Sequence, residues 1–283
     1  MSATLTAPET PVVVPEAGRV TFPRLLRAEW IKFVTVRSTW WSLALVAAVS
    51  VGLSLLQALA LSTYASEDGH PTAAAEINAT AVMVIVYATV LTQLLAVIIG
   101  AITVTGEYST GMIRSTLTAA PGRIGAALAK ALVVAVALFV FSLIVFAIAG
   151  LLTAPMLPHG GLDLSHPDSS VMPLLGAALY LAMIGVLGVG LGFIIRNGPG
   201  ALATGVSLVF VAPIIAMFFP AEAEFAWLQD AAGHFPANAG QSLFMGAPTS
   251  GVPLEFWPAL ITVIAWGVAA VIAGAVVLKS RDA

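Results

Sequence analysis

Six long apolar stretches set the main constraint on how this chain can fold. They cover residues 39–62, 79–104, 126–152, 171–195, 200–220 and 257–278. Each is close to the roughly 20 residues that a helix needs to cross a hydrocarbon layer of about 30 Å. Only 9% of the 283 residues are charged, whereas soluble domains carry about 25%. We therefore predict an all-α, polytopic membrane protein with six transmembrane helices in residues 39–279.

The positions of the positive charges predict the orientation of these spans. All 11 Lys and Arg residues lie in four places: residues 19–37, residues 114–130, Arg196 and residues 279–281. The other connections contain none of them but hold nine of the 14 acidic residues and all four His; they are residues 63–78, 153–170 and 221–256. Loops rich in Lys and Arg stay on the cytoplasmic side. We expect both termini and the loop between the second and third spans to be cytoplasmic, in a multi-pass plasma-membrane protein.

The N-terminal region divides into a tail and an amphipathic helix. Residues 1–21 hold prolines and small residues without an apolar block, which predicts a disordered cytoplasmic tail. Residues 22–38 predict a helix lying in the membrane interface, with its cations near the headgroups. Its candidate interfacial residues are Arg24, Leu26, Arg27, Trp30, Lys32 and Phe33. Leu26, Trp30 and Phe33 share the predicted apolar face with Val34. A positive flank that only orients the first span remains an alternative.

A polar stretch, residues 105–123, connects the second and third spans. Gly106 and Gly111 permit sharp turns, and Ser109 or Thr110 can cap a new helix. Pro121-Gly122 would stop that helix, which we place at residues 111–118. Its apolar face would carry Met112, Ile113 and Leu117, opposite Arg114 and Ser115. Glu107 would accept hydrogen bonds from the free N–H groups of this helix or pair with Arg114.

Two interpretations of this stretch remain open. It is a capped loop in which Arg114 and Arg123 fix the orientation, or it is a docking helix for a partner. Residues 107–117, followed by Pro121-Gly-Arg123, resemble the cytoplasmic loop between the second and third spans of type 2 ATP-binding-cassette (ABC) exporter permeases. In that family the loop carries the coupling helix that docks on the ATPase. The resemblance implies an ATPase-coupling role for Glu107, Gly111, Met112, Arg114, Leu117, Pro121 and Arg123.

The layout of the chain is similar to the same family. It has an amphipathic N-terminal helix, six spans and a long last outer loop at residues 221–256. Within that loop, residues 236–244 resemble the family's re-entrant outer helices, and a plain amphipathic surface loop is the alternative. The resemblance implies a second permease half, as a homodimer or heterodimer, and a cytoplasmic ABC-type ATPase as partners. It also implies export of an amphipathic, drug-like or lipid-like substrate across the lipid bilayer.

The source of energy is expected outside this chain. Glu107 lies just past the end of one span and Lys130 near the start of another, so no charged relay for ion coupling is visible at mid-span. A phosphate-binding loop needs a Gly-Lys step, and none of the three lysines follows a glycine. We therefore expect ATP to be bound by the partner, with no cofactor, enzyme activity or nucleic-acid partner here. A scaffold or assembly protein without transport is the alternative.

Other chemistry receives little support from the sequence. The chain has no Cys, every His lies in an outer loop, and no Asp lies within a span, so we expect no catalytic residue. His159, Asp163, His166 and Asp168 crowd one outer loop and are residue types that bind zinc or nickel. No helical spacing aims these side chains together, and we expect no metal site. In the later spans, Gly188 and Gly192 predict close helix packing, and Pro213 predicts a kink.

The topology is testable by cysteine labelling, because the chain has no native Cys. In intact cells, Ser115→Cys should resist a membrane-impermeant thiol reagent, whereas Ser165→Cys should react. Labelling of Ser115→Cys from outside the cell would contradict the predicted orientation.

Overall fold

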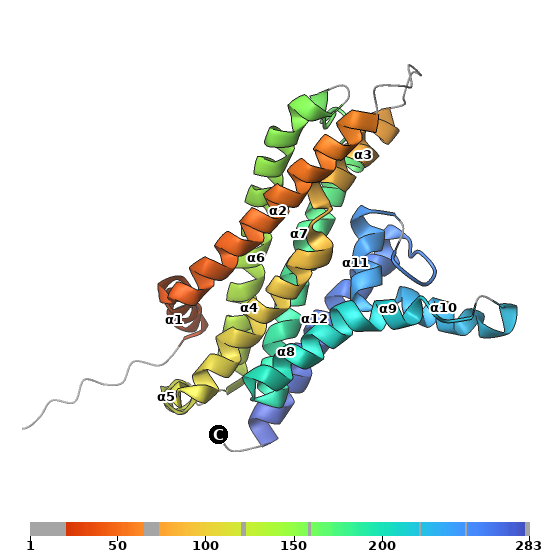
Figure 1. Cartoon of the computed structure of the whole chain (residues 1–283). Coiled ribbons are helices and arrows are strands. Elements are labelled where there is room, and N and C mark those ends of the chain that lie inside the picture. Colours follow the sequence, from red (N-terminus) through yellow and green to blue (C-terminus); the bar gives the residue numbers. More distant parts are fainter. Residues whose placement is uncertain are drawn as a thin grey trace, which may run out of the picture.

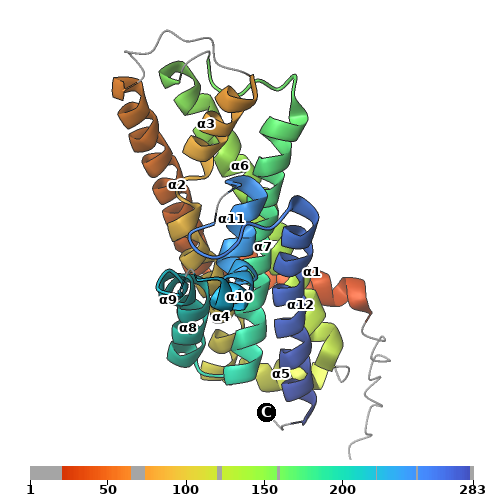
Figure 2. The same ribbon diagram turned by 90° about the vertical axis from the view of Figure 1, so that its right-hand side faces the viewer.

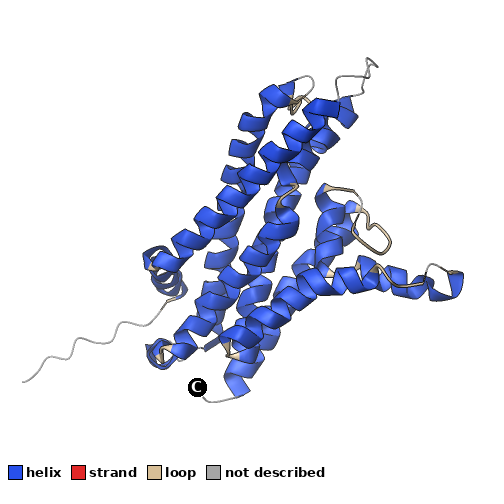
Figure 3. Cartoon of the chain, in the orientation of Figure 1, coloured by secondary structure: helices blue, strands red, loops and turns tan. Residues whose placement is uncertain are grey.

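A computed structural model of the protein describes residues 21–64, 74–119, 123–157, 160–220, 222–246 and 248–280. Within these ranges the regular structure is helical, as Figure 3 shows. The predicted all-α class is confirmed. The α-helices are α1 (Phe22–Thr35), α2 (Arg37–Tyr64), α3 (Ala74–Val86), α4 (Thr89–Ser109), α5 (Met112–Ala119), α6 (Arg123–Thr153), α7 (Pro167–Ile195), α8 (Gly198–Val206), α9 (Ala212–Ala216), α10 (Ala226–Gly233), α11 (Pro236–Phe244) and α12 (Phe256–Ser280).

Six helical segments in the described ranges are long and apolar enough to cross a membrane. They are α2, α4, α6, α7, the continuous run from α8 to α9, and α12. We call the end of these segments that carries α5, the start of α8 and the end of α12 the basic end; it lies at the bottom of Figure 1. The predicted tail, residues 1–21, lies outside the described residues except for Thr21, and the orientation in a membrane remains a prediction.

The second apolar stretch differs from its prediction as one helix. It forms α3 and α4, which are separated at Tyr87 and Ala88. A break in a helix leaves backbone carbonyls without partners, and Ser54 of α2 donates a hydrogen bond to the Ile85 carbonyl at 3.0 Å. After the break, α4 continues to Ser109, so Gly106 is helical rather than a turn residue. The polar connection is correspondingly shorter than the predicted one.

Helix α7 forms the centre of the structure. It packs against α4, α6 and α12, and Figures 1 and 2 show it running the length of the molecule. Of its most apolar 18-residue window 78% is buried, against 28% for α2. A Cβ atom added at Gly188 would lie 2.3 Å from the Val97 carbonyl oxygen of α4, and one at Gly192 would lie 2.8 Å from Cβ of Val104. The predicted close packing at these glycines is therefore confirmed.

The fifth span contains an irregular turn, and the segment that follows it packs against other helices. Residues 207–211 form a π-helical turn directly before Pro213, so the irregularity expected at this proline is a widened turn. Helix α11 is buried against α7 and α12, which excludes a plain surface loop for this part of the chain. Ser250 joins the two regions, because its hydroxyl donates to the Pro213 carbonyl at 2.9 Å and accepts a 2.9 Å hydrogen bond from Asn238 Nδ2 of α11.

The packing of α4 on α7 makes a specific prediction about Gly188→Ala. The added methyl group must push the two helices apart, and we expect a loss of about 1–3 kcal/mol of stability. Gly52 of α2 is the matched control, because a Cβ there meets no atom within 4 Å. Gly52→Ala should be neutral or gain about 0.5–1 kcal/mol from helix propensity. Thermal unfolding in detergent measures both, and equal midpoints for the two variants would contradict the packing argument.

Candidate functional site

Helix α1 is held against the spans by a face that contains a charged residue. Its first turn contains Pro23, whose fixed φ suits a helix start, and its buried residues are Glu29 and Phe33. Leu26 packs against the core, but Trp30 is 46% exposed. The predicted apolar face is therefore confirmed at Leu26, Phe33 and Val34 but wrong at Trp30, whose expected inward position is taken by Glu29. Arg24 and Arg27 lie on the exposed side of α1.

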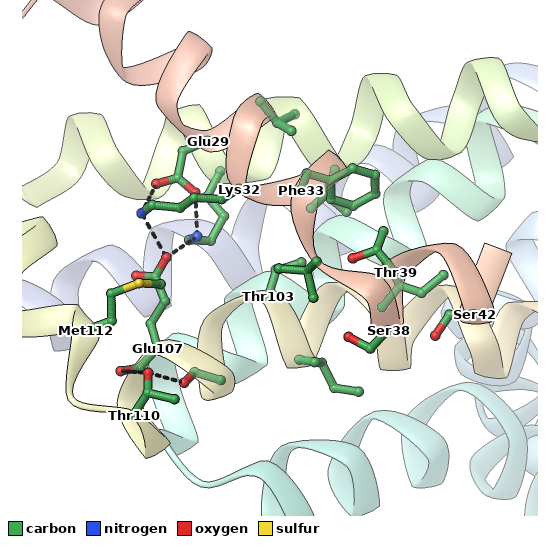
Figure 4. Close-up of a pocket in the computed structure, with 17 residues that line it drawn as sticks. Glu29, Lys32, Phe33, Ser38, Thr39, Ser42, Thr103, Glu107, Thr110 and Met112 are labelled. Carbon is green, nitrogen blue, oxygen red and sulfur yellow. Dashed lines mark hydrogen bonds and ion pairs between the residues drawn. The ribbon is translucent and has the colours of Figure 1, made fainter.

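Glu29 belongs to a set of four paired charges, which we call the four-charge cluster: Glu29, Lys32, Glu107 and Lys130. Lys130 Nζ of α6 lies 2.5 Å from Glu29 Oε2 and 2.8 Å from Glu107 Oε1 of α4. Lys32 Nζ lies 2.8 Å from Glu29 Oε1 and 3.0 Å from Glu107 Oε1. Each ammonium thus contacts both carboxylates, and Figure 4 shows the labelled members pointing toward one another.

Burial makes this pairing necessary. The side chains of Glu29, Glu107 and Lys130 are only 5%, 4% and 6% exposed, and that of Lys32 is 31% exposed. An unpaired charge at such a position costs several kcal/mol, whereas two cations and two anions in contact form a neutral set. Burial alone would lower the pKa of Lys32. The hydrogen bonds to Glu29 and Glu107 have a larger, opposite effect, so the pKa of Lys32 lies above its ordinary value of 10.5. Lys32 is therefore charged at neutral pH.

The cluster also contacts α5. Lys32 Nζ donates to Thr116 Oγ1 at 3.3 Å, and Thr116 Oγ1 lies 3.4 Å from Glu107 Oε2. Glu107 thus bonds to Lys32, Lys130 and Thr116, and the expected alternatives, pairing with Arg114 or capping α5, are wrong. Four helices meet at this point: α1, α4, α5 and α6.

The turn between α4 and α5 depends on Gly111. Its φ of +72° is in the left-handed region, and a Cβ there would meet no atom within 4 Å, so the constraint is backbone conformation rather than space. The Ser109 and Thr110 hydroxyls donate to the Gly106 carbonyl at 3.0 and 2.9 Å. They therefore bond at the end of α4 and do not cap the start of α5 as expected.

Helix α5 matches the predicted helix at residues 111–118 to within one residue at each end. Its Ile113 is buried, and Leu117 packs against the core. Met112 is 42% exposed, and Arg114, Ser115 and Thr118 are also exposed. The apolar face therefore turns toward this chain, and the outward surface of α5 is mostly polar. Pro121 lies outside the described residues.

Two arginines bind the end of α12. Arg123 Nη1 donates to the Leu278 carbonyl at 3.0 Å, and Arg196 Nη2 donates to the Val277 carbonyl at 3.1 Å. Cations at a helix C-terminus stabilise carbonyls that lack helical partners. The guanidinium carbon of Arg196 also lies 5.4 Å from the centroid of the Tyr108 ring, and this contact connects α4 to the end of α12. Arg123, expected at the ATPase contact, thus has a structural contact within the chain.

The acidic and His residues of the loop before α7 do not form a metal centre in the described part of the chain. There, no three His, Asp or Glu side chains lie together as metal ligands would, and His159 lies outside the described residues. Asp163 Oδ1 accepts hydrogen bonds from the Ser165 hydroxyl and amide, and these bonds lower the pKa of Asp163. His166 Nδ1 lies 3.1 Å from Asp163 Oδ2.

Sequence reasoning missed Glu29, Lys130 and Thr116 as members of this site. The sequence did carry a signal for Glu29 and Lys130. Glu107 and Lys130 lie at the ends of apolar spans, and each requires an opposite charge once it is buried. Glu29 precedes Lys32 by one helical turn and is the one acidic residue in α1. Comparison with known proteins gives no match to a family model and none to a curated sequence.

The four-charge cluster predicts a specific pattern of stabilities. Lys130→Met leaves two buried carboxylates with one lysine, and we expect a loss of about 3–5 kcal/mol. Adding Glu29→Gln to this variant should recover part of the loss, since Lys32 and Glu107 then remain as a neutral pair. Lys279→Met, at an exposed position of α12, is the control and should leave thermal unfolding unchanged. Strictly additive losses in the double variant would show that the four charges do not act together.

Proposed function

We propose that this chain is the membrane permease subunit of an ABC exporter of type 2. A separate cytoplasmic ATPase would supply the energy, and a second permease half would complete the transport path. The proposal rests on the sequence resemblance of residues 107–123 and on the arrangement of the helices at the basic end. The exported substrate is proposed to be amphipathic, drug-like or lipid-like.

One structural observation supports this proposal most strongly. A short helix, α5, presents an exposed polar surface at the basic end, while its other face contacts the four-charge cluster through Thr116. That cluster joins α5 to α1, α4 and α6. A displacement of α5 by a docked ATPase would therefore reach two spans and α1 through direct contacts.

The coupling test uses the outward surface of α5, because Leu117 packs inward and Leu117→Asp would destabilise the chain itself. Ser115→Trp and Arg114→Glu change exposed side chains, and we expect both variants to fold normally. Binding of the ATPase should weaken by about tenfold or more, which corresponds to about 1.4 kcal/mol. ATP hydrolysis stimulated by the permease in vesicles should fall in parallel.

The partner for this test is an ATPase with a Gly-x-x-x-x-Gly-Lys-Ser/Thr loop, purified with the wild-type chain from detergent and then reconstituted. Ser165→Trp, in the exposed loop before α7, is the matched control and should couple normally. The isolated chain should not hydrolyse ATP. If Ser115→Trp is folded and couples like wild type, α5 is not the docking helix. If no such ATPase associates, the scaffold alternative is favoured.

A further inference from the structure

A cavity lies directly beside the four-charge cluster. Its volume is about 460 Å³, and α1, α2, α4 and α6 contribute its walls. Phe33, Ile99, Val133 and Val134 make part of the wall apolar. Figure 4 shows the charged residues at one end of this space and Ser38, Thr39, Ser42 and Thr103 farther along it. The cavity thus combines a charged end, several hydroxyl groups and apolar walls.

The charged end is neutral as a set, but it exposes one of its cations, Lys32, to a ligand. Each carboxylate oxygen of Glu29 and Glu107 contacts a lysine or Thr116. Lys32 is the member of the cluster with substantial exposure, at 31%, and its ammonium is charged at neutral pH. Its third hydrogen bond, 3.3 Å to Thr116 Oγ1, is the longest that it makes in the described structure. A phosphate oxygen can replace that bond with a shorter, charge-assisted one.

The hydroxyl groups and the mouth of the cavity identify the rest of the ligand. Ser38 and Ser42 are one turn apart on α2, and neither side chain makes a hydrogen bond within the described structure. They can donate to ester oxygens. Val36, Ile102 and Met112 line the cavity and are 47%, 41% and 42% exposed, so its mouth carries large apolar side chains beside the exposed Ser38 and Thr110. These apolar side chains suit acyl chains, which a small hydrated anion lacks.

We propose that this cavity binds the headgroup of an anionic phospholipid from the membrane leaflet at the basic end, with its phosphate on Lys32. A zwitterionic choline headgroup fits less well, because its cation would lie near the ammonium of Lys32, and each carboxylate oxygen of Glu29 and Glu107 already has a partner in this chain. The exposed Arg27 of α1 adds positive charge to the same helix and favours anionic lipid near it. This inference concerns binding alone and does not depend on the proposed transport function.

Native mass spectrometry of the purified chain tests the proposal, with dioctanoyl phosphatidylglycerol as the probe. We expect one bound molecule per chain at low lipid concentration. Dioctanoyl phosphatidylcholine should bind at least about fivefold more weakly, the factor that corresponds to about 1 kcal/mol for one cation at a membrane surface. Glycerol 3-phosphate, which has the phosphate without acyl chains, should not bind detectably.

Two variants locate the binding site. Lys32→Gln should weaken phosphatidylglycerol binding by about fivefold. Because Lys32 also belongs to the four-charge cluster, Ser42→Leu provides a second variant that fills the cavity and leaves all four charges in place. It should weaken binding by a similar factor without lowering thermal stability. Ala48→Leu, at an exposed position of the same helix, is the control and should bind like wild type.

Four results would overturn the proposal. Equal binding of phosphatidylcholine would remove the role of charge, and equal binding of glycerol 3-phosphate would indicate a site for free phosphate. Unchanged binding by Ser42→Leu would place the lipid elsewhere. Loss of a dimer in Ser42→Leu, with lipid binding retained, would show that a second copy of the chain covers the cavity.

Discussion

The pairing of four charges, three of them buried, is the interaction on which the basic end of this structure depends. Glu107 and Lys130 lie on spans and are almost inaccessible, and they contact each other at 2.8 Å. The second acid and the second base come from α1, which supplies Glu29 and Lys32. Without α1, Glu107 and Lys130 would each lose hydrogen-bonding partners at a position that water hardly reaches, and this loss would cost stability. The attachment of α1 is therefore specified by charge pairing as well as by the apolar contact of Phe33.

This attachment matters because the first span is otherwise peripheral. The central helix α7 is joined to α4 and α12 through glycines at which an added Cβ would collide with backbone atoms, as at Gly188 and Gly190. By contrast, α2 buries a much smaller share of its apolar window than α7 does. The cavity beside the four-charge cluster lies between these two regions, where α1 and α2 meet α4 and α6. The ionic contacts of the four-charge cluster thus connect α1, beside the cavity, to α4 and α6, which pack on the central helix α7.

The sequence was sufficient for the features that depend on length and composition. The six apolar stretches, α1, and a short helix at residues 111–118 all follow from such patterns, and each is present. The break at Tyr87 and Ala88 was not predictable, because no Pro or Gly marks it and the carbonyl that it exposes is bonded by Ser54, a residue distant in sequence. The inward position of Glu29 on α1 was missed although the sequence carried a signal for it. An apolar pattern favours Trp30 on the buried face, but the buried Lys130 requires an anion there, and Glu29 is that anion.

The same requirement bears on how the proposed coupling would work. A neutral, closely paired cluster resists the separation of its members, because removing one partner leaves a buried charge uncompensated. Thr116 contacts this cluster at distances of 3.3 and 3.4 Å, which are longer than any contact among the four charges. Movement of α5 would therefore either carry the cluster with it or break the Thr116 contacts first. Within the proposed function, the weak contacts of Thr116 act beside the packing of Ile113 and Leu117 in passing a displacement of α5 to the rest of the chain.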